Sequence, residues 1–145
     1  MQKRAPVHPW AGDAWSVAGV EPEPESGAAP GPHDGPPIRI EPLIRTADLE
    51  LYRARGLELG LYPDENDGYF ENWAAPAPKV FVRWRMQDGI AMPVLASVSY
   101  SEGTRMFDSG DPADGVEMPP EIHAWLAHYL RRHYQPPAGG KRHRA

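Results

Sequence analysis

The chain lacks cysteine altogether. This absence excludes disulfides, iron–sulfur clusters, thiolate zinc sites and cysteine nucleophiles, and it is compatible with a cytoplasmic location. Long apolar runs are missing too, since none approaches the roughly 18 residues of a membrane-spanning helix. The two basic residues near the N-terminus are not followed by the apolar stretch of a secretory signal. We therefore expect a cytoplasmic protein that does not enter a membrane.

Several catalytic and ligand-binding motifs are also absent. There is no Gly-rich phosphate loop, no Gly-Lys-Ser/Thr pair and no Gly-x-Ser-x-Gly nucleophile elbow. His123, His128 and His133 recur every five residues, a spacing that turns successive side chains by about 140° around a helix. Because a sound metal site wants two ligands on one rigid element, we expect no metal and no cofactor, and a binding protein rather than an enzyme.

A length of 145 residues suits one domain with its own core. Alternation of apolar and polar residues predicts a strand around Trp15 and further strands at residues 38–44, 48–53, 57–62, 80–86 and 92–100. The segments 48–53 and 57–62 are predicted to form a hairpin, and Asp88-Gly89 predicts a tight turn between the last two strands. The expected class is α+β: a single domain with a curved antiparallel sheet, a partial barrel, and a C-terminal amphipathic helix packed on it.

Three helices are predicted. Asp64 is expected to N-cap a helix of at most two turns, whose aromatic side chains face the sheet: Tyr69, Phe70 and Trp73. Ser99 and Glu102 fit a capping box that opens a helix ending near residue 108. The last helix begins near Pro120 and carries an apolar stripe at i, i+3, i+4, i+7 and i+8: Ile122, Trp125, Leu126, Tyr129 and Leu130.

Charge is distributed unevenly around the formal net charge of -5. The 15 residues from Arg131 onward carry +5, and the preceding 130 carry -10. Residues 21–37 include six prolines and no large apolar side chain, which predicts a mobile loop. We expect residues 1–135 to form the domain and residues 136–145 a disordered basic tail. The tail either solubilises the protein or binds an acidic partner or nucleic acid.

Candidate partner-binding residues fall into three groups. Trp10 and Trp15 flank an N-terminal loop, where an exposed tryptophan could anchor a partner. An acidic group after the fourth predicted strand suits a basic partner, although helix capping and a solvated face account for the same residues: Asp64, Glu65, Asp67 and Glu71. The third group lies in the basic tail: Lys141, Arg142 and Arg144.

Arg83 and Arg85 are the candidates for binding a small ligand. They share a predicted sheet face with Phe81, an arrangement on which single-stranded nucleic acid could stack. The acidic body of the chain opposes this, because phosphate binding needs a positive surface. We therefore do not expect a nucleic-acid partner.

A series of short motifs covers nearly the whole chain outside residues 21–37. They comprise Pro9-Trp10, Trp15, residues 57–65, Gly68-Tyr69, Asn72, residues 76–82, residues 98–102, residues 114–116, residues 119–121, Trp125 and the basic end at 141–144. In this order they resemble a family of uncharacterised bacterial proteins, domain-of-unknown-function family 3305. Members usually begin with a longer apolar strand before the first tryptophan, where this chain has only residues 1–7.

The resemblance implies a function by association. Genes of this family tend to lie beside those of molybdenum- or tungsten-dependent formate dehydrogenases and their maturation factors. It therefore implies a non-catalytic accessory or assembly protein that binds a molybdoenzyme subunit or a maturation factor. The alternative is a small protein that binds or processes molybdopterin guanine dinucleotide or a related nucleotide. The nucleotide-cradling loop that such a nucleotidyltransferase needs is absent from the sequence.

Overall fold

The computed structural model describes residues 1–4, 14–22 and 38–135. This part of the chain contains seven strands, three α-helices and one 3-10 turn, so the α+β class is confirmed. The strands are divided between two antiparallel sheets rather than joined in one curved sheet. Within the described part, no helix is long and apolar enough to cross a membrane. The predicted loop at 21–37 and the basic tail at 136–145 lie almost wholly outside the described residues, and the division into domain and tail stays a prediction.

The first sheet has the order β2-β1-β4-β3. Its strands are β1 (Gln2–Arg4), β2 (Ala14–Ser16), β3 (Arg39–Arg45) and β4 (Leu49–Arg55). A strand therefore does precede the first tryptophan, and it lies between β2 and β4. The backbone of Met1 is fixed against Tyr52 by two hydrogen bonds of 2.8 Å, one in each direction. Burial lowers the pKa of the Met1 amino group from its usual value.

The hairpin predicted between residues 48–53 and 57–62 is wrong. β4 pairs with β3 and β1, and residues 57–62 form no strand. Their alternating leucines nevertheless pack against the core: Leu57, Leu59 and Leu61. Alternation reports that one side of an extended segment is buried. It does not report whether that segment pairs with a neighbour, which explains the error.

The second sheet has the order β6-β5-β7. It consists of β5 (Lys79–Gln87), β6 (Ile90–Ser97) and β7 (Ala113–Glu117). The predicted turn between β5 and β6 is confirmed, with Asp88 at φ 53° and Gly89 at φ 81°, as a type I′ turn requires. β7 was not predicted. Its Gly115 lies opposite Phe81, and a Cβ there would stand 3.2 Å from the Phe81 ring.

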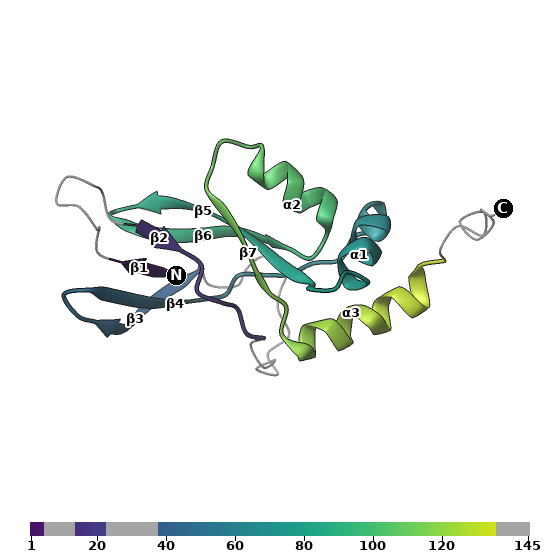
Figure 1. The fold of residues 1–145 in the computed structure, drawn as a ribbon, viewed down its shortest axis with the longest axis horizontal. Coiled ribbons are helices and arrows are strands. Elements are labelled where there is room, and N and C mark those ends of the chain that lie inside the picture. The colour runs from purple at the N-terminus through teal and green to yellow at the C-terminus, as the bar shows by residue number, and fades with distance from the viewer. Residues whose placement is uncertain (5–13, 23–37, 136–145) are drawn as a thin grey trace.

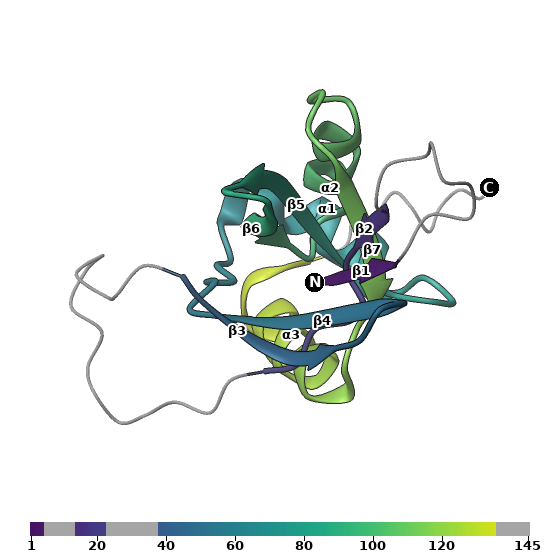
Figure 2. The same ribbon diagram turned by 90° about the vertical axis from the view of Figure 1, so that its left-hand side faces the viewer.

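The helices cover both faces of this second sheet (Figures 1 and 2). α1 (Asn66–Trp73) and α3 (Pro120–His133) lie on one face. There their side chains form the main core with two residues of β5 and one that follows β6: Tyr69, Leu126 and Leu130 with Val80, Val82 and Val98. α2 (Tyr100–Phe107) lies on the opposite face, close enough to Phe81 that a Cβ at Gly103 would stand 2.8 Å from its ring. β5 is therefore buried on both sides along its first half.

The apolar stripe of α3 is narrower than predicted. Ile122, Leu126 and Leu130 are buried, but Trp125 is 42% exposed and does not belong to the core. The position beside Ile122 is taken by His123, whose ring stacks on that of Trp73 at 5.1 Å and 14°. Because α1 covers part of the same sheet face, α3 needs to bury fewer of its own side chains against the sheet.

A second, smaller cluster joins the two sheets. Met1, Trp84 and Ala91 are buried together, with Trp15 and Val17 packed against them. The Asp114 carboxylate of β7 accepts hydrogen bonds from the Val17 backbone N–H at 2.9 Å and from Trp84 Nε1 at 3.2 Å. The four-stranded sheet thus lies across the far end of β5 and β6, away from α1 and α3 (Figure 1).

Candidate functional site

A polar network surrounds the N-terminus of α2. Ser99 caps the helix by accepting a hydrogen bond from the Glu102 backbone N–H at 3.3 Å, as predicted. The Glu102 side chain does not return to the Ser99 N–H, as a capping box would require. It accepts a hydrogen bond from the Ser97 hydroxyl, and Ser97 in turn accepts the Ser99 N–H at 3.0 Å. The Ser97 hydroxyl therefore links the Glu102 carboxylate to the Ser99 N–H, which would be bonded directly in a capping box.

Glu65 joins this network from the 3-10 turn η1 (Pro63–Glu65). Its carboxylate accepts hydrogen bonds from Ser99 Oγ and Arg105 Nη2, both at 2.7 Å. Burial favours a higher pKa for Glu65, but these two hydrogen bonds and the charge of Arg105 outweigh it and hold the pKa below its usual range. Glu65 is therefore engaged within the fold, and its partner-binding role stays a prediction.

Gly68 lets α1 approach this network closely. A Cβ at position 68 would stand 2.2 Å from Ser99 Oγ and 3.2 Å from the Ser101 backbone nitrogen. The glycine is poor for a helix in isolation, but any side chain there would displace the capping serine. The contact between α1 and α2 therefore depends on this residue.

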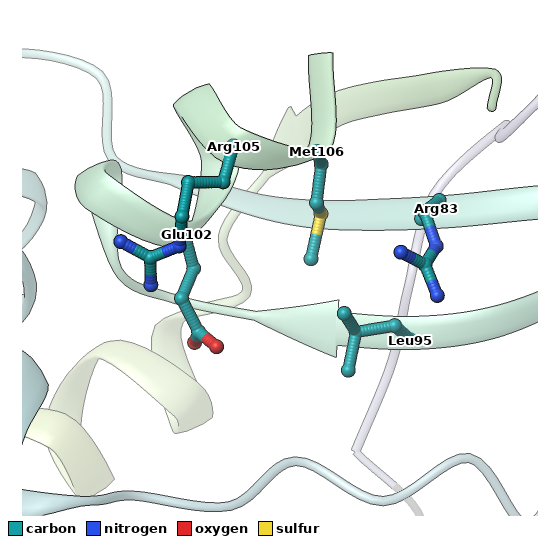
Figure 3. A pocket seen from close by; sticks show the side chains of 5 residues that line it. All are labelled: Arg83, Leu95, Glu102, Arg105 and Met106. Atoms are coloured by element: carbon teal, nitrogen blue, oxygen red, sulfur yellow. The ribbon is translucent and has the colours of Figure 1, made fainter. Parts of the chain in front are cut away.

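A cavity of about 150 Å³ opens between α2 and the β6 side of the sheet. It is lined by Arg83, Leu95, Glu102, Arg105 and Met106; we call it the Arg83 cavity. Met106 extends from α2 toward β6, with Arg83 on one side and Glu102 and Arg105 on the other (Figure 3). Arg83 and Leu95 come together because they are paired across β5 and β6.

The charge of Arg83 is only partly compensated. Asp111 Oδ2 lies 3.7 Å from Arg83 Nε and 3.2 Å from Arg85 Nη2, so one carboxylate serves two guanidinium groups. The longer distance exceeds hydrogen-bonding range. Arg83 Nε is buried and has no hydrogen-bond partner. Of the two arginines predicted as ligand-binding, only Arg83 lines the cavity, and a ligand-binding role for either stays a prediction.

Large apolar side chains are exposed around the same helix. Phe107 is 54% exposed, and Tyr100 and Leu95 are each 37% exposed. We call these three residues, with Arg83 and Arg105, the α2 surface. Phe81 itself is buried, so it offers no face on which a nucleotide base could stack.

The structure brings few of the predicted partner-binding residues together. Asp64, Asp67 and Glu71 are exposed. Burial raises the pKa of Tyr134, which follows α3, and the hydrogen bond between its hydroxyl and Asp67 raises this pKa further. Asp64 is not the N-cap of α1, because η1 intervenes and Glu65 occupies that position. Trp15, which packs in the cluster that joins the two sheets, also contacts Tyr52, with ring centroids 5.7 Å apart and planes tilted by 35°. No group of three potential metal ligands occurs within the described residues.

The remaining predicted partner-binding residues lie outside the described part of the chain: Trp10, Lys141, Arg142 and Arg144. Four residues at or beside the Arg83 cavity were not predicted from the sequence: Leu95, Arg105, Met106 and Asp111. No motif marks these residues, because they meet only through strand register and the position of α2.

The structure thus defines an α+β protein in which apolar and arginine side chains share one exposed surface beside a short helix. The chain belongs to a family of proteins of unknown function, DUF3305, which matches it over residues 1–144. The family resemblance seen in the sequence is therefore confirmed. No curated protein and no solved structure matches the chain.

Proposed function

We propose that this protein is a non-catalytic accessory protein that binds another protein through the α2 surface. The observation that carries the proposal is the exposure of Tyr100 and Phe107 beside the arginines of the Arg83 cavity. Aromatic side chains and arginine are enriched at the centres of protein interfaces and provide much of their binding energy.

The two aromatic side chains rest on a rigid base, which favours this role. The Phe81 ring contacts both of them, with ring centroids 5.9 Å from Tyr100 and 6.2 Å from Phe107. Phe81 is itself held between Gly103 and Gly115. Anchors that are already ordered lose little conformational entropy when a partner binds.

The family resemblance suggests a class of partner. We propose a subunit or a maturation factor of a formate dehydrogenase-type molybdoenzyme, because genes of this family tend to neighbour those of such enzymes. Gene neighbourhood is an association and supplies no contact. The partner must therefore be identified by experiment.

The experiment is affinity capture from cells that express the whole operon. We expect the wild-type protein to retain a molybdoenzyme subunit or maturation factor, and Phe107→Ser to retain it at least about tenfold less, since a buried aromatic anchor contributes about 2 kcal/mol or more. Trp125→Ser is the matched control, because Trp125 is also an exposed aromatic residue but lies on α3. Equal capture by both variants, or recovery of neither protein class, would refute the proposal.

The alternative, binding of molybdopterin guanine dinucleotide or a related nucleotide, makes a different prediction. It requires micromolar binding of the free nucleotide by the purified protein, with loss of binding on substitution of Arg83 or Arg85. Titration with the dinucleotide and with guanine nucleotides separates the two functions.

A further inference from the structure

We propose that the Arg83 cavity binds a carboxylate group, supplied in the cell by a glutamate or aspartate side chain of the protein partner. The inference rests on the proposed function for the source of the carboxylate. The site itself rests on Arg83 and on the walls of the cavity.

Arg83 offers a hydrogen-bond donor that the fold does not use. Its Nε is buried without an acceptor, a state that disfavours the structure until an acceptor is provided. A carboxylate can accept from Nε and a terminal nitrogen of one guanidinium at the same time, which is the strongest geometry for this pair. Such a ligand would leave Asp111 to Arg85, to which it is already closer.

The other charges around the cavity favour a single negative charge. Arg105 is paired with Glu65, and Glu102 is hydrogen-bonded to Ser97. Arg83 is therefore the lining cation whose charge is least compensated. Glu102 and Asp111 would repel a dianion, such as a phosphate monoester, more strongly than a carboxylate with a single negative charge. A monoanionic carboxylate therefore fits the site better.

The size and walls of the cavity favour a side chain over a large ligand. About 150 Å³ corresponds to roughly five water molecules and is below the roughly 300–1,000 Å³ typical of small-molecule pockets. Leu95 and Met106 form apolar walls against which the methylene groups of a glutamate can pack. Phe107 and Tyr100 lie on the helix that also provides Glu102, Arg105 and Met106 to the cavity, so an acidic side chain could enter it while its neighbours contact these rings.

The test is an NMR titration that follows the Arg83 Nε–Hε signal. We expect N-acetyl-glutamate amide to shift this signal with a millimolar dissociation constant, and the uncharged N-acetyl-glutamine amide to leave it unchanged. The matched control is the Arg53 signal. Arg53 and Arg55 also share one carboxylate, that of Glu41, at 3.6 and 3.3 Å, but Arg53 does not line the Arg83 cavity.

Two variants make the result specific. Arg83→Lys keeps the charge but loses the guanidinium fork, and we expect the backbone shifts of Leu95 and Met106 on titration to disappear. Asp111→Asn removes the competing carboxylate, and we expect it to tighten binding by roughly two- to fivefold, the effect of one partly exposed charge pair. Equal responses of Arg83 and Arg53, unchanged binding by Arg83→Lys, or weaker binding by Asp111→Asn would each overturn the site.

A further comparison tests whether the carboxylate comes from the protein partner or from a free small molecule. Free propionate is compared with a short acidic peptide derived from the captured partner, and we expect the peptide to bind at least tenfold tighter. If propionate binds as tightly as the peptide, the site stands as a free-carboxylate site and the partner side chain is rejected. If capture fails but the glutamate titration succeeds, only the proposed function is refuted.

Discussion

Replacement of Gly68 by alanine should destabilise the protein, although the same change in an ordinary helix stabilises it. Alanine is favoured over glycine in a helix interior by about 1 kcal/mol. At position 68 the added Cβ would stand 2.2 Å from Ser99 Oγ. Either α1 moves away or Ser99 rotates, and in both cases the close contact between α1 and α2 is lost.

The expected cost follows from the hydrogen bonds that Ser99 makes. Rotation would remove the N-cap of α2, worth about 1 kcal/mol, and the hydrogen bond to the Glu65 carboxylate, worth about 1.5–3 kcal/mol. After subtraction of the gain in helix propensity, Gly68→Ala should lower the free energy of unfolding by about 2 kcal/mol.

Equilibrium urea denaturation, followed by tryptophan fluorescence, measures this change. The control is the same substitution in a Ser99→Ala background, where the colliding hydroxyl is absent. There Gly68→Ala should cost less than about 1 kcal/mol, so the double-mutant cycle should give a coupling of at least about 1 kcal/mol. Stabilisation by Gly68→Ala in the wild-type background would refute the reasoning, because helix propensity would then outweigh the collision.

Three further predictions concern buried polar groups. Asn72 makes three hydrogen bonds of 2.7–2.9 Å to the backbone of Lys79 in β5 and of Val98, which follows β6. Asn72→Ala should lower the free energy of unfolding by about 3 kcal/mol in the same urea assay; a loss below 1 kcal/mol would contradict this. Burial raises the pKa of Tyr69 to about 12, so the stability it contributes is complete below its unfolded pKa of about 10 and is lost as the pH rises through 12. The loss should reach about 3 kcal/mol, and Tyr69→Phe should not show this alkaline component. Glu65 has a lowered pKa, so its contribution is present above its unfolded pKa of about 4.3 and is lost as the pH falls below that value. A pH titration of stability should show a shallower acid limb in Glu65→Gln, and an unchanged limb would argue against the Arg105 interaction.

Local signals in the sequence predicted much of the second sheet and its helices. The Asp88-Gly89 turn, the Ser99 cap and the α3 stripe each depend on residues within a few positions of one another. β7 was not predicted because its five residues, Ala-Asp-Gly-Val-Glu, contain one branched apolar side chain and no alternation of apolar and polar residues. It forms a strand because Gly115 accommodates the Phe81 ring.

The candidate site could not be predicted for a different reason. Arg83 was singled out by its position on a sheet face, but its cavity depends on the pairing of Arg83 with Leu95 across β5 and β6 and on α2 lying over the sheet. Both are tertiary features. The acidic group around Asp64 and Asp67 was visible as a pattern, yet only the fold shows that Glu65 turns inward to Ser99 and Arg105.

The hydrogen bond from the Val17 backbone to Asp114 has a consequence for folding. It joins residues 97 positions apart, and β1 likewise pairs with β4 across a long stretch of chain. Closing such loops is entropically costly and slow. During synthesis, β1 and β2 leave the ribosome first but cannot complete their packing until β7 has emerged. The contact between the two sheets through Asp114 should therefore form only after β7 has been synthesised.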